Sequence, residues 1–156
     1  MQGQSKVVQQ LNKVLTSELT SINQYFLHAR ICKNWGFEEL NEHEYKASIK
    51  AMKVADDLIE RILFLEGNPD VASREALRIG KDVPSMMKND LIYELEVGQN
   101  LKKVIKICEE EQDYVSRDLL VSLLEDTEED HTYWLEKQLG LIDKMGLQNY
   151  IQSQMS

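Results

Sequence analysis

The chain has 156 residues, 42% of them hydrophobic and 29% charged, which suits one globular domain over residues 1–156. The net charge of -9 and the absence of a strong basic run argue against a nucleic-acid partner, and no apolar run approaches the length of a membrane span. With 7 Gly and 2 Pro, long stretches carry no helix breaker, so we expect an all-α fold.

A first long helix is predicted from near Ser5 to near Asn34, where Gly36 follows as a stop signal. Its apolar stripe consists of Val8, Leu11, Leu15, Leu19, Ile22, Phe26 and Ala29. Glu18 and Tyr25 lie seven residues apart and therefore share a face close to this stripe. A lone glutamate in this place is also typical of the boundary between core and surface.

The second helix is predicted from about Glu38 to Glu66, and residues 67–69 end it. One apolar stripe would face the core: Ala47, Ala51, Val54, Ala55, Leu58, Ile62 and Leu65. A second stripe is rotated away from the first: Tyr45, Ile49, Met52, Ile59 and Leu63. This second stripe needs a partner of its own, and an interface between subunits is the simplest one. Met52 lies in it, close to Lys50 and Lys53.

Residues 67–83 have a weak pattern and form a long connection, which can travel the length of a bundle. The third helix is predicted to start near Pro84, because proline is favoured in the first turn of a helix. The pattern pauses at 111–113, and a fourth long helix follows. A short final helix is predicted over 147–154.

Four long helices, one long crossover and a short fifth helix predict a four-helix bundle of the ferritin-like kind. In the di-iron members of this class, two helices each give one Glu and the other two each give a Glu-x-x-His pair. Glu18 and Glu94 match the single residues, and Glu128 with His131 matches one pair. The second helix has Ala-Met-Lys-Val over residues 51–54, so both ligands of the other pair are missing.

Four stretches carry a resemblance to a known family: Leu19–His28, Glu60–Gly67, Asp113–Asp118 and Met145–Tyr150. In these stretches, and over nearly its whole length, the chain resembles the bacterioferritins. The resemblance implies a hollow cage of about two dozen subunits that stores ferric mineral. It also implies haem b on the two-fold axis between subunits, held by one methionine from each. Met52 matches that methionine.

A haem ligand at Met52 agrees with the chemistry of the residue, because a thioether is an accepted axial ligand of haem iron. A symmetric interface would place two such residues opposite each other. The alternative is that Met52 only fills a gap in the interface, as methionine often does. The residues expected to surround a porphyrin are Leu19, Asn23, Phe26, Tyr45 and Ile49.

The chain departs from the resemblance at the di-iron centre. Members with an active centre have Glu-Met-Lys-His where this chain has Ala51 to Val54. The missing Glu would bridge two irons and the missing His would bind one, so metal affinity should fall steeply. Lys46 and Lys50 stand where the family often has a His and an Asp that face the cage interior. Lysines there would repel Fe(II).

The fourth helix has one extra residue relative to the family, near Glu125–Thr127. We therefore place the Glu-x-x-His pair at Glu128 and His131. If the extra residue lies elsewhere, a neighbouring acid such as Glu129 would take the role of Glu128.

The expected function is that of a haem-binding, largely structural subunit of an iron-storage cage. Such a subunit would oxidise Fe(II) slowly by itself and would co-assemble with a second, ferroxidase-competent subunit. The first alternative is an active ferroxidase in which Glu94, Glu128 and His131 hold one iron and Tyr25 donates an electron. The second alternative is a haem store or electron carrier in which the iron cage is incidental.

The resemblance also implies a small ferredoxin as the electron donor for iron release, and the expected cofactors are haem b and iron. The remnant residues Glu18, Glu94, Glu128 and His131 would hold a single metal, or would pair with one another, with Tyr25 or with water. Two cysteines without metal-type spacing and an N-terminus without an apolar segment favour a cytoplasmic protein.

Overall fold

The computed structural model describes residues 1–155, and over that range it consists of helices and connections without strands. The first three long helices are α1 (Ser5–Asn34), α2 (Glu38–Phe64) and α3 (Val83–Glu110). The fourth long helix is continuous through three segments, α4 (Tyr114–Asp126), η1 (Thr127–Thr132) and α5 (Tyr133–Met145). A short helix, α6 (Leu147–Ser153), ends the chain.

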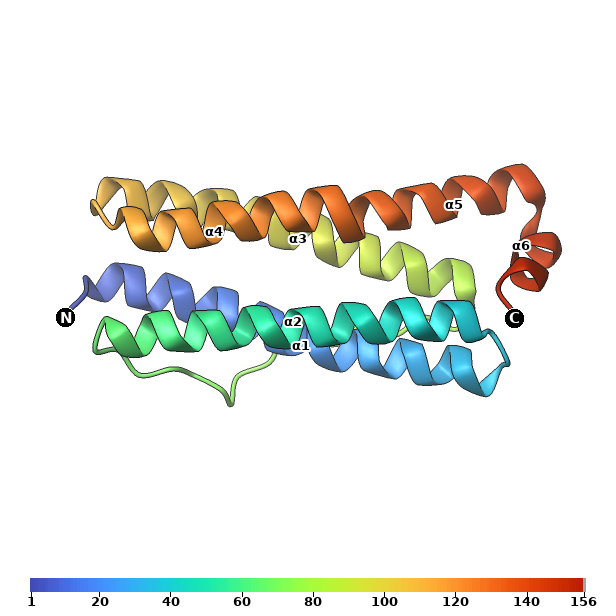
Figure 1. Ribbon diagram of the computed structural model, residues 1–156, viewed down its shortest axis with the longest axis horizontal. Helices are drawn as coiled ribbons and strands as arrows, with labels where there is room; N and C mark the ends of the chain where they lie inside the picture. Colours follow the sequence, from blue (N-terminus) through green and yellow to red (C-terminus); the bar gives the residue numbers. More distant parts are fainter. Residues whose placement is uncertain (156) are drawn as a thin grey trace.

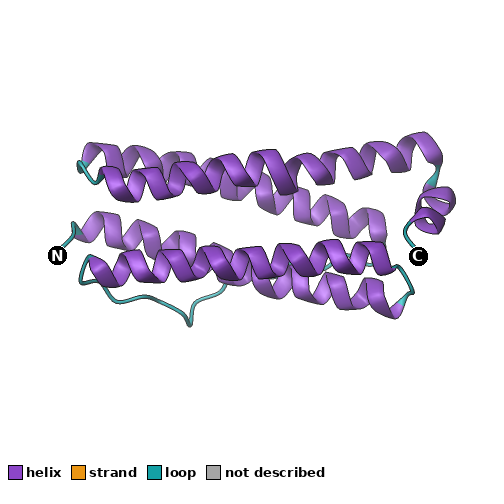
Figure 2. Ribbon diagram, viewed as in Figure 1, coloured by secondary structure: helices purple, strands orange, loops and turns teal. Residues whose placement is uncertain are grey.

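The long helices lie side by side, with α1 beside α2 and α3 beside the fourth helix, and α6 turns across one end of the bundle (Figure 1). Figure 2 shows the loops confined to the ends of the bundle, apart from the crossover between α2 and α3, which runs along its side. The predicted four-helix bundle with a long crossover and a short fifth helix is therefore confirmed. No helix within residues 1–155 is long and apolar enough to cross a membrane.

The core of the bundle has two apolar ends and a polar middle. One apolar cluster includes Leu11 and Leu101, and the other includes Leu40 and Leu135. The stretches of α1, α2 and α3 between these clusters bury polar side chains instead: Glu18, Gln24, His28, Glu44, Asp90 and Glu94. A buried polar group is costly unless it is hydrogen-bonded or neutralised, so this polar middle is where a binding site is expected.

The crossover is fixed to α1 by backbone N–H groups that donate to polar side chains. Four such hydrogen bonds of 2.8–3.1 Å run in order along α1, to Asn12, Thr20, Gln24 and His28. Gly80 donates the last of them, and here the backbone approaches α3 closely. A Cβ at this position would lie 2.3 Å from the backbone nitrogen of Met86, so only glycine fits. The fold thus brings the Gly80 N–H to a buried imidazole.

Candidate metal pocket and haem-binding surface

A cavity of about 230 Å³ opens between α2 and the fourth helix, beside the polar middle of the bundle. The structure brings Glu18, Tyr25, Glu94 and His131 together around it, from α1, α3 and η1. Four of the predicted site residues therefore share one pocket, although they lie far apart in the sequence. Part of the lining is apolar and consists of Ala47, Ala51, Val54 and Leu123. Ala51 and Val54, where the resemblance predicts a Glu and a His in an active centre, line the pocket.

Glu128 does not line this pocket. Its side chain is exposed, and its carboxylate faces Lys102 at 3.9 Å. The physical reason is that residues 127–132 form a π-helix, which absorbs one extra residue in a single wide turn. The π-helix at 127–132 lies where the extra residue was predicted, and Glu128 is turned away from the pocket. Glu129 is also exposed and lines a neighbouring groove.

Burial decides the charge of the groups that remain in the pocket. It raises the pKa of Glu18 to about 8, with the nearby Glu94 carboxylate adding to the rise. Burial likewise raises the pKa of Glu94 to about 7, although Tyr25 donates a hydrogen bond to this carboxylate. Burial lowers the pKa of His131 to about 4, so the imidazole is neutral at pH 7. Its Nε2 atom is buried without a hydrogen-bond partner among residues 1–155.

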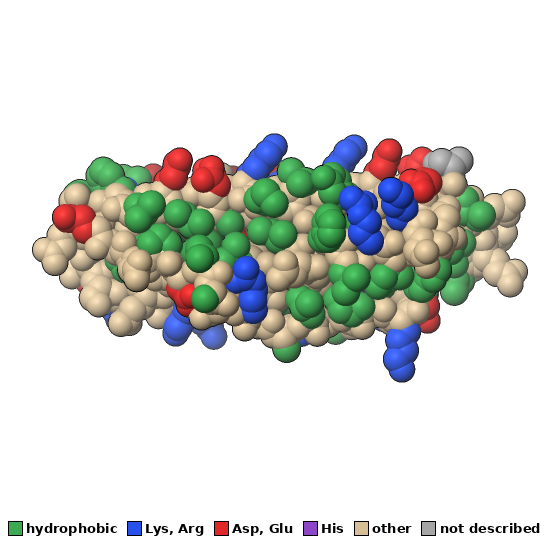
Figure 3. All heavy atoms as spheres, turned by 90° about the horizontal axis from the view of Figure 1, so that it is seen from below, with side chains coloured by type: hydrophobic (Ala, Val, Ile, Leu, Met, Phe, Trp, Pro, Cys, Tyr) green, Lys and Arg blue, Asp and Glu red, His purple; other side chains and the backbone are tan. Residues whose placement is uncertain are grey.

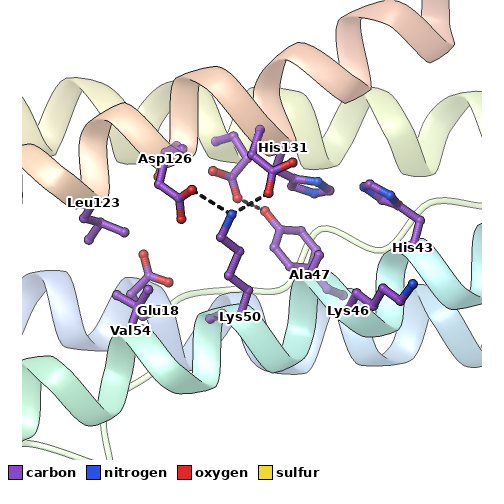
Figure 4. A pocket seen from close by; sticks show the side chains of 14 residues that line it. Glu18, His43, Lys46, Ala47, Lys50, Val54, Leu123, Asp126 and His131 are labelled. Carbon is purple, nitrogen blue, oxygen red and sulfur yellow. Dashed lines mark hydrogen bonds and ion pairs between the residues drawn. The ribbon is translucent and has the colours of Figure 1, made fainter.

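Lys50 extends from α2 toward the fourth helix (Figure 4). Its ammonium lies 2.8 Å from Oδ1 of Asp126 and also donates to the carboxylate of Asp130. Burial works against the charge on Lys50, but these hydrogen bonds raise its pKa. The hydrogen bond from Lys50 lowers the pKa of Asp130. The pocket therefore contains a positively charged side chain, the ammonium group of Lys50.

Sequence reasoning missed His43, which also lines the pocket. Its ring stacks on Trp134, with the ring centroids 3.5 Å apart and the planes 9° apart. His131 lies beside this stack, and its ring meets that of Tyr25 edge-on at 4.8 Å. Burial lowers the pKa of His43 to about 4, and the neighbouring His131 adds to this shift. The spacing of His43 and Lys50, seven residues on one helix, was the sequence signal for a shared face.

A second polar cluster, which we call the closed cluster, consists of His28, Glu44 and Asp90. Each residue is at most 3% exposed, and each offers one ligand atom within 4.8 Å of the others. By residue type and spacing alone, this group resembles a metal site. Sequence reasoning missed it because its members come from three helices, whose relative register cannot be read from periodicity.

Hydrogen bonds give the closed cluster a different interpretation. Nε2 of His28 accepts the Gly80 N–H at 3.1 Å, so this nitrogen carries no proton in a neutral ring. The proton is then on Nδ1, which lies 3.0 Å from Oδ1 of Asp90. A metal on Nδ1 would move the proton to Nε2, where it would face another N–H. With His28 in this tautomer, Nδ1 carries the proton and is not a lone-pair donor to a metal ion.

Glu44 completes the chain of hydrogen bonds. Burial raises its pKa well above the ordinary value, and the Asp90 carboxylate adds both charge repulsion and a hydrogen bond. A protonated Glu44 can donate to Asp90, whose Oδ2 otherwise has no partner among residues 1–155. Gln24 donates to Oδ1 at 2.8 Å. One proton on Glu44 would thus give Oδ2 of Asp90 a partner, whereas Nδ1 of His28 has no hydrogen-bond partner among residues 1–155.

The surface predicted for haem lies on α1 and α2. Met52 is 51% exposed, and Phe26 and Tyr45 are 45% and 38% exposed. Asn23 is also exposed, whereas Leu19 and Ile49 are partly buried. Figure 3 shows hydrophobic side chains over much of this side of the molecule, with lysines and arginines among them. Large apolar side chains in this exposure are typical of an interface.

One cation is held on this surface by aromatic rings. The guanidinium carbon of Arg30 lies 4.9 Å from the ring centroids of both Phe26 and Tyr45. Arg30 also donates to the side-chain oxygen of Asn41 at 3.0 Å. The surface therefore presents an apolar stripe with a fixed positive charge near one end, which suits a flat ligand with anionic groups.

Comparison with known proteins gives one consistent result. A family model described as the ferritin-like domain matches residues 8–145. A bacterial ferritin of Synechocystis sp. is 54% identical to the chain, and the alignment covers 100% of both proteins. A bacterial ferritin of Paramagnetospirillum magnetotacticum is 51% identical over 98% of this chain and 94% of its own. A bacterioferritin of Mycolicibacterium paratuberculosis is 44% identical over 96% and 94%, respectively.

Proposed function

The chain belongs to the ferritin family, and we propose that it is an iron-storage subunit with a haem-binding surface and a degenerate di-iron centre. The observation that carries this proposal is the set of side chains that line the pocket. Ala51 and Val54 line it without donor atoms, Glu128 is turned away from it, and Lys50 supplies a positive charge. Two adjacent iron ions need bridging carboxylates and several further ligands, which this arrangement lacks.

The pocket predicts slow iron oxidation by the chain alone. With about two Fe(II) per subunit in air, the rate should not exceed the buffer blank. The double variant Ala51→Glu with Val54→His returns a carboxylate and an imidazole to the α2 wall and should increase the rate. Each single variant is the matched control, because neither restores both ligands. No gain in the double variant would contradict a centre that is degenerate at these two positions.

An active ferroxidase is the second candidate, and one observation favours it. His131 presents an unpartnered Nε2 in the same pocket as Glu94 and Tyr25, so a single iron has an imidazole and a carboxylate available. The same assay separates the two candidates. A fast, saturable phase in the unchanged chain would establish the ferroxidase and contradict the degenerate centre.

The haem-binding part of the proposal is supported by the exposed stripe on α1 and α2. Met52 would supply an axial thioether, and Leu19, Phe26, Tyr45 and Ile49 would line the faces of the ring, with Asn23 at its edge. On a two-fold axis a second copy of the chain would supply the second Met52. Bound haem would provide a one-electron carrier for the release of stored iron.

Haem content tests the role of Met52. The variant Met52→Leu keeps the apolar volume but removes the sulfur, so the purified protein should lose most of its haem absorbance. Met145→Leu is the control, because Met145 is 39% exposed and ends α5, away from the α2 stripe. Equal haem content in both variants would contradict ligation by Met52.

The assembly proposed here is a cage of homologous subunits. In a mixed cage, a second subunit with a complete di-iron centre would oxidise iron, and this chain would contribute haem and cage wall. A small ferredoxin would reduce the haem. Co-purification of a second subunit from the source cells tests the mixed cage.

A further inference from the structure

Lys50 supplies a positive charge to the pocket, and its contacts join two of the pocket's walls. Its ammonium lies 2.8 Å from Asp126 and also binds Asp130. Asp126 ends α4 and Asp130 lies in η1, so the lysine joins α2 to the fourth helix at the π-helix. The close-up view shows both contacts as dashed lines from one nitrogen (Figure 4).

The two aspartates contribute carboxylate oxygens to the pocket. Carboxylate oxygens are common protein ligands of divalent cations. Here both of them already accept hydrogen bonds from the same ammonium. A divalent cation would have to displace Lys50 or to remain beside its positive charge, and repulsion between charges a few ångströms apart is large at a partly buried site.

The π-helix explains why Asp130, and not Glu128, joins Asp126 in facing the lysine. Residues inside a π turn are rotated relative to a regular helix. Asp126 and Asp130 line the pocket, whereas Glu128 faces Lys102 on the outside. The same local distortion therefore removes a metal ligand and creates a binding site for an ammonium group.

We propose that Lys50 is the built-in cation of the pocket and its specificity-determining residue, which excludes divalent cations by occupying Asp126 and Asp130. The proposal rests on the proposed function only in treating the pocket as the remnant of a di-iron centre. Lys46 is the lysine with which Lys50 can be compared. It lines the same pocket but forms no ion pair within residues 1–155.

Zinc binding to the assembled protein tests this exclusion. Zn²⁺ is the probe because it has no redox chemistry, and calorimetry at neutral pH would measure its affinity for each variant. Lys50→Met keeps the length of the side chain without its charge, and it should gain a site about tenfold or more tighter than any in the unchanged protein. Lys46→Met is the matched control and should change zinc affinity by less than about threefold. Lys50→Arg keeps the charge and should still exclude zinc.

Three outcomes would overturn the proposal. The first is equally tight zinc binding by the unchanged protein and Lys50→Met. The second is an equal gain in Lys50→Met and Lys46→Met, which would indicate only a change in net charge. The third is tight binding by Lys50→Arg. If Lys50→Met does not assemble, Lys50→Gln provides the neutral variant. The zinc titration uses neither haem nor iron oxidation, so its failure is distinguishable from failure of the proposed function.

Discussion

The middle of the bundle contains two sites built from imidazoles and carboxyl groups. The pocket has two imidazoles and four carboxyl groups, among them His131, Glu18 and Glu94, whereas the closed cluster consists of His28, Glu44 and Asp90. Both sites therefore offer residue types that bind metal ions. Their surroundings differ, because the pocket opens between α2 and the fourth helix, whereas the residues of the closed cluster are at most 3% exposed.

The difference shows that the hydrogen bond made by one nitrogen of an imidazole ring decides whether the other nitrogen carries a proton. His28 is fixed in one tautomer by the Gly80 N–H, which places the proton on Nδ1, 3.0 Å from Oδ1 of Asp90. In the pocket, Nε2 of His131 has no hydrogen-bond partner among residues 1–155, and the nearby acids Asp126 and Asp130 pair with Lys50. A proton on Glu44 thus serves Asp90 in the closed cluster, and the ammonium of Lys50 serves Asp126 and Asp130 in the pocket.

The largest effect that distinguishes the two clusters should come from removing one acid from each. Asp90→Ala leaves His28, Gln24 and Glu44 buried without their shared acceptor, which should lower the free energy of unfolding by about 3–5 kcal/mol. Asp126→Ala removes a half-exposed partner of Lys50 and should cost about 0–1 kcal/mol. Urea unfolding of both variants measures the difference. Similar costs would contradict the division into a sealed cluster and an open one.

Most of the fold could be predicted from the sequence, for identifiable reasons. Apolar periodicity sets the long helices, Gly36 and Pro69 mark helix ends, and the weak pattern of residues 67–83 leaves room for the crossover. The absence of donor side chains at Ala51 and Val54 could also be read directly, because the identity of a residue does not depend on packing. Those parts of the prediction needed only local information.

The parts that could not be predicted depend on register between helices. The sequence showed one extra residue near Glu125–Thr127, but not that a π-helix would absorb it and turn Glu128 outward. It showed Lys50 near the metal positions, but not that Asp126 and Asp130 would both reach its ammonium. These contacts follow from the rotation of one helix against another, which a hydrophobic pattern fixes only approximately.

A smaller effect, on the pH dependence of the folding stability, should distinguish Glu44 from an ordinary surface acid. Because the pKa of Glu44 is raised in the folded protein, the folded state binds a proton that the unfolded state releases above about pH 4.5. The stability that this proton provides is complete below that pH and is lost as the pH rises. Glu44→Gln keeps a donor for Asp90 without titrating, so it should gain stability over the unchanged chain between pH 5 and pH 8, and the gain should grow with pH.

Thermal unfolding at several pH values measures this trend, with Glu42→Gln as the control because Glu42 is exposed on the same helix. The control removes the same formal charge without removing a buried proton, so its effect should be nearly independent of pH. Groups that act on Glu44 from neighbouring helices are Asp90 and Glu94 on α3 and Cys32 on α1, and each favours the protonated form. A loss of stability in Glu44→Gln that grows with pH would show that Glu44 is ionised in the folded protein. The closed cluster would then need a cation after all, and the contrast with the pocket would disappear.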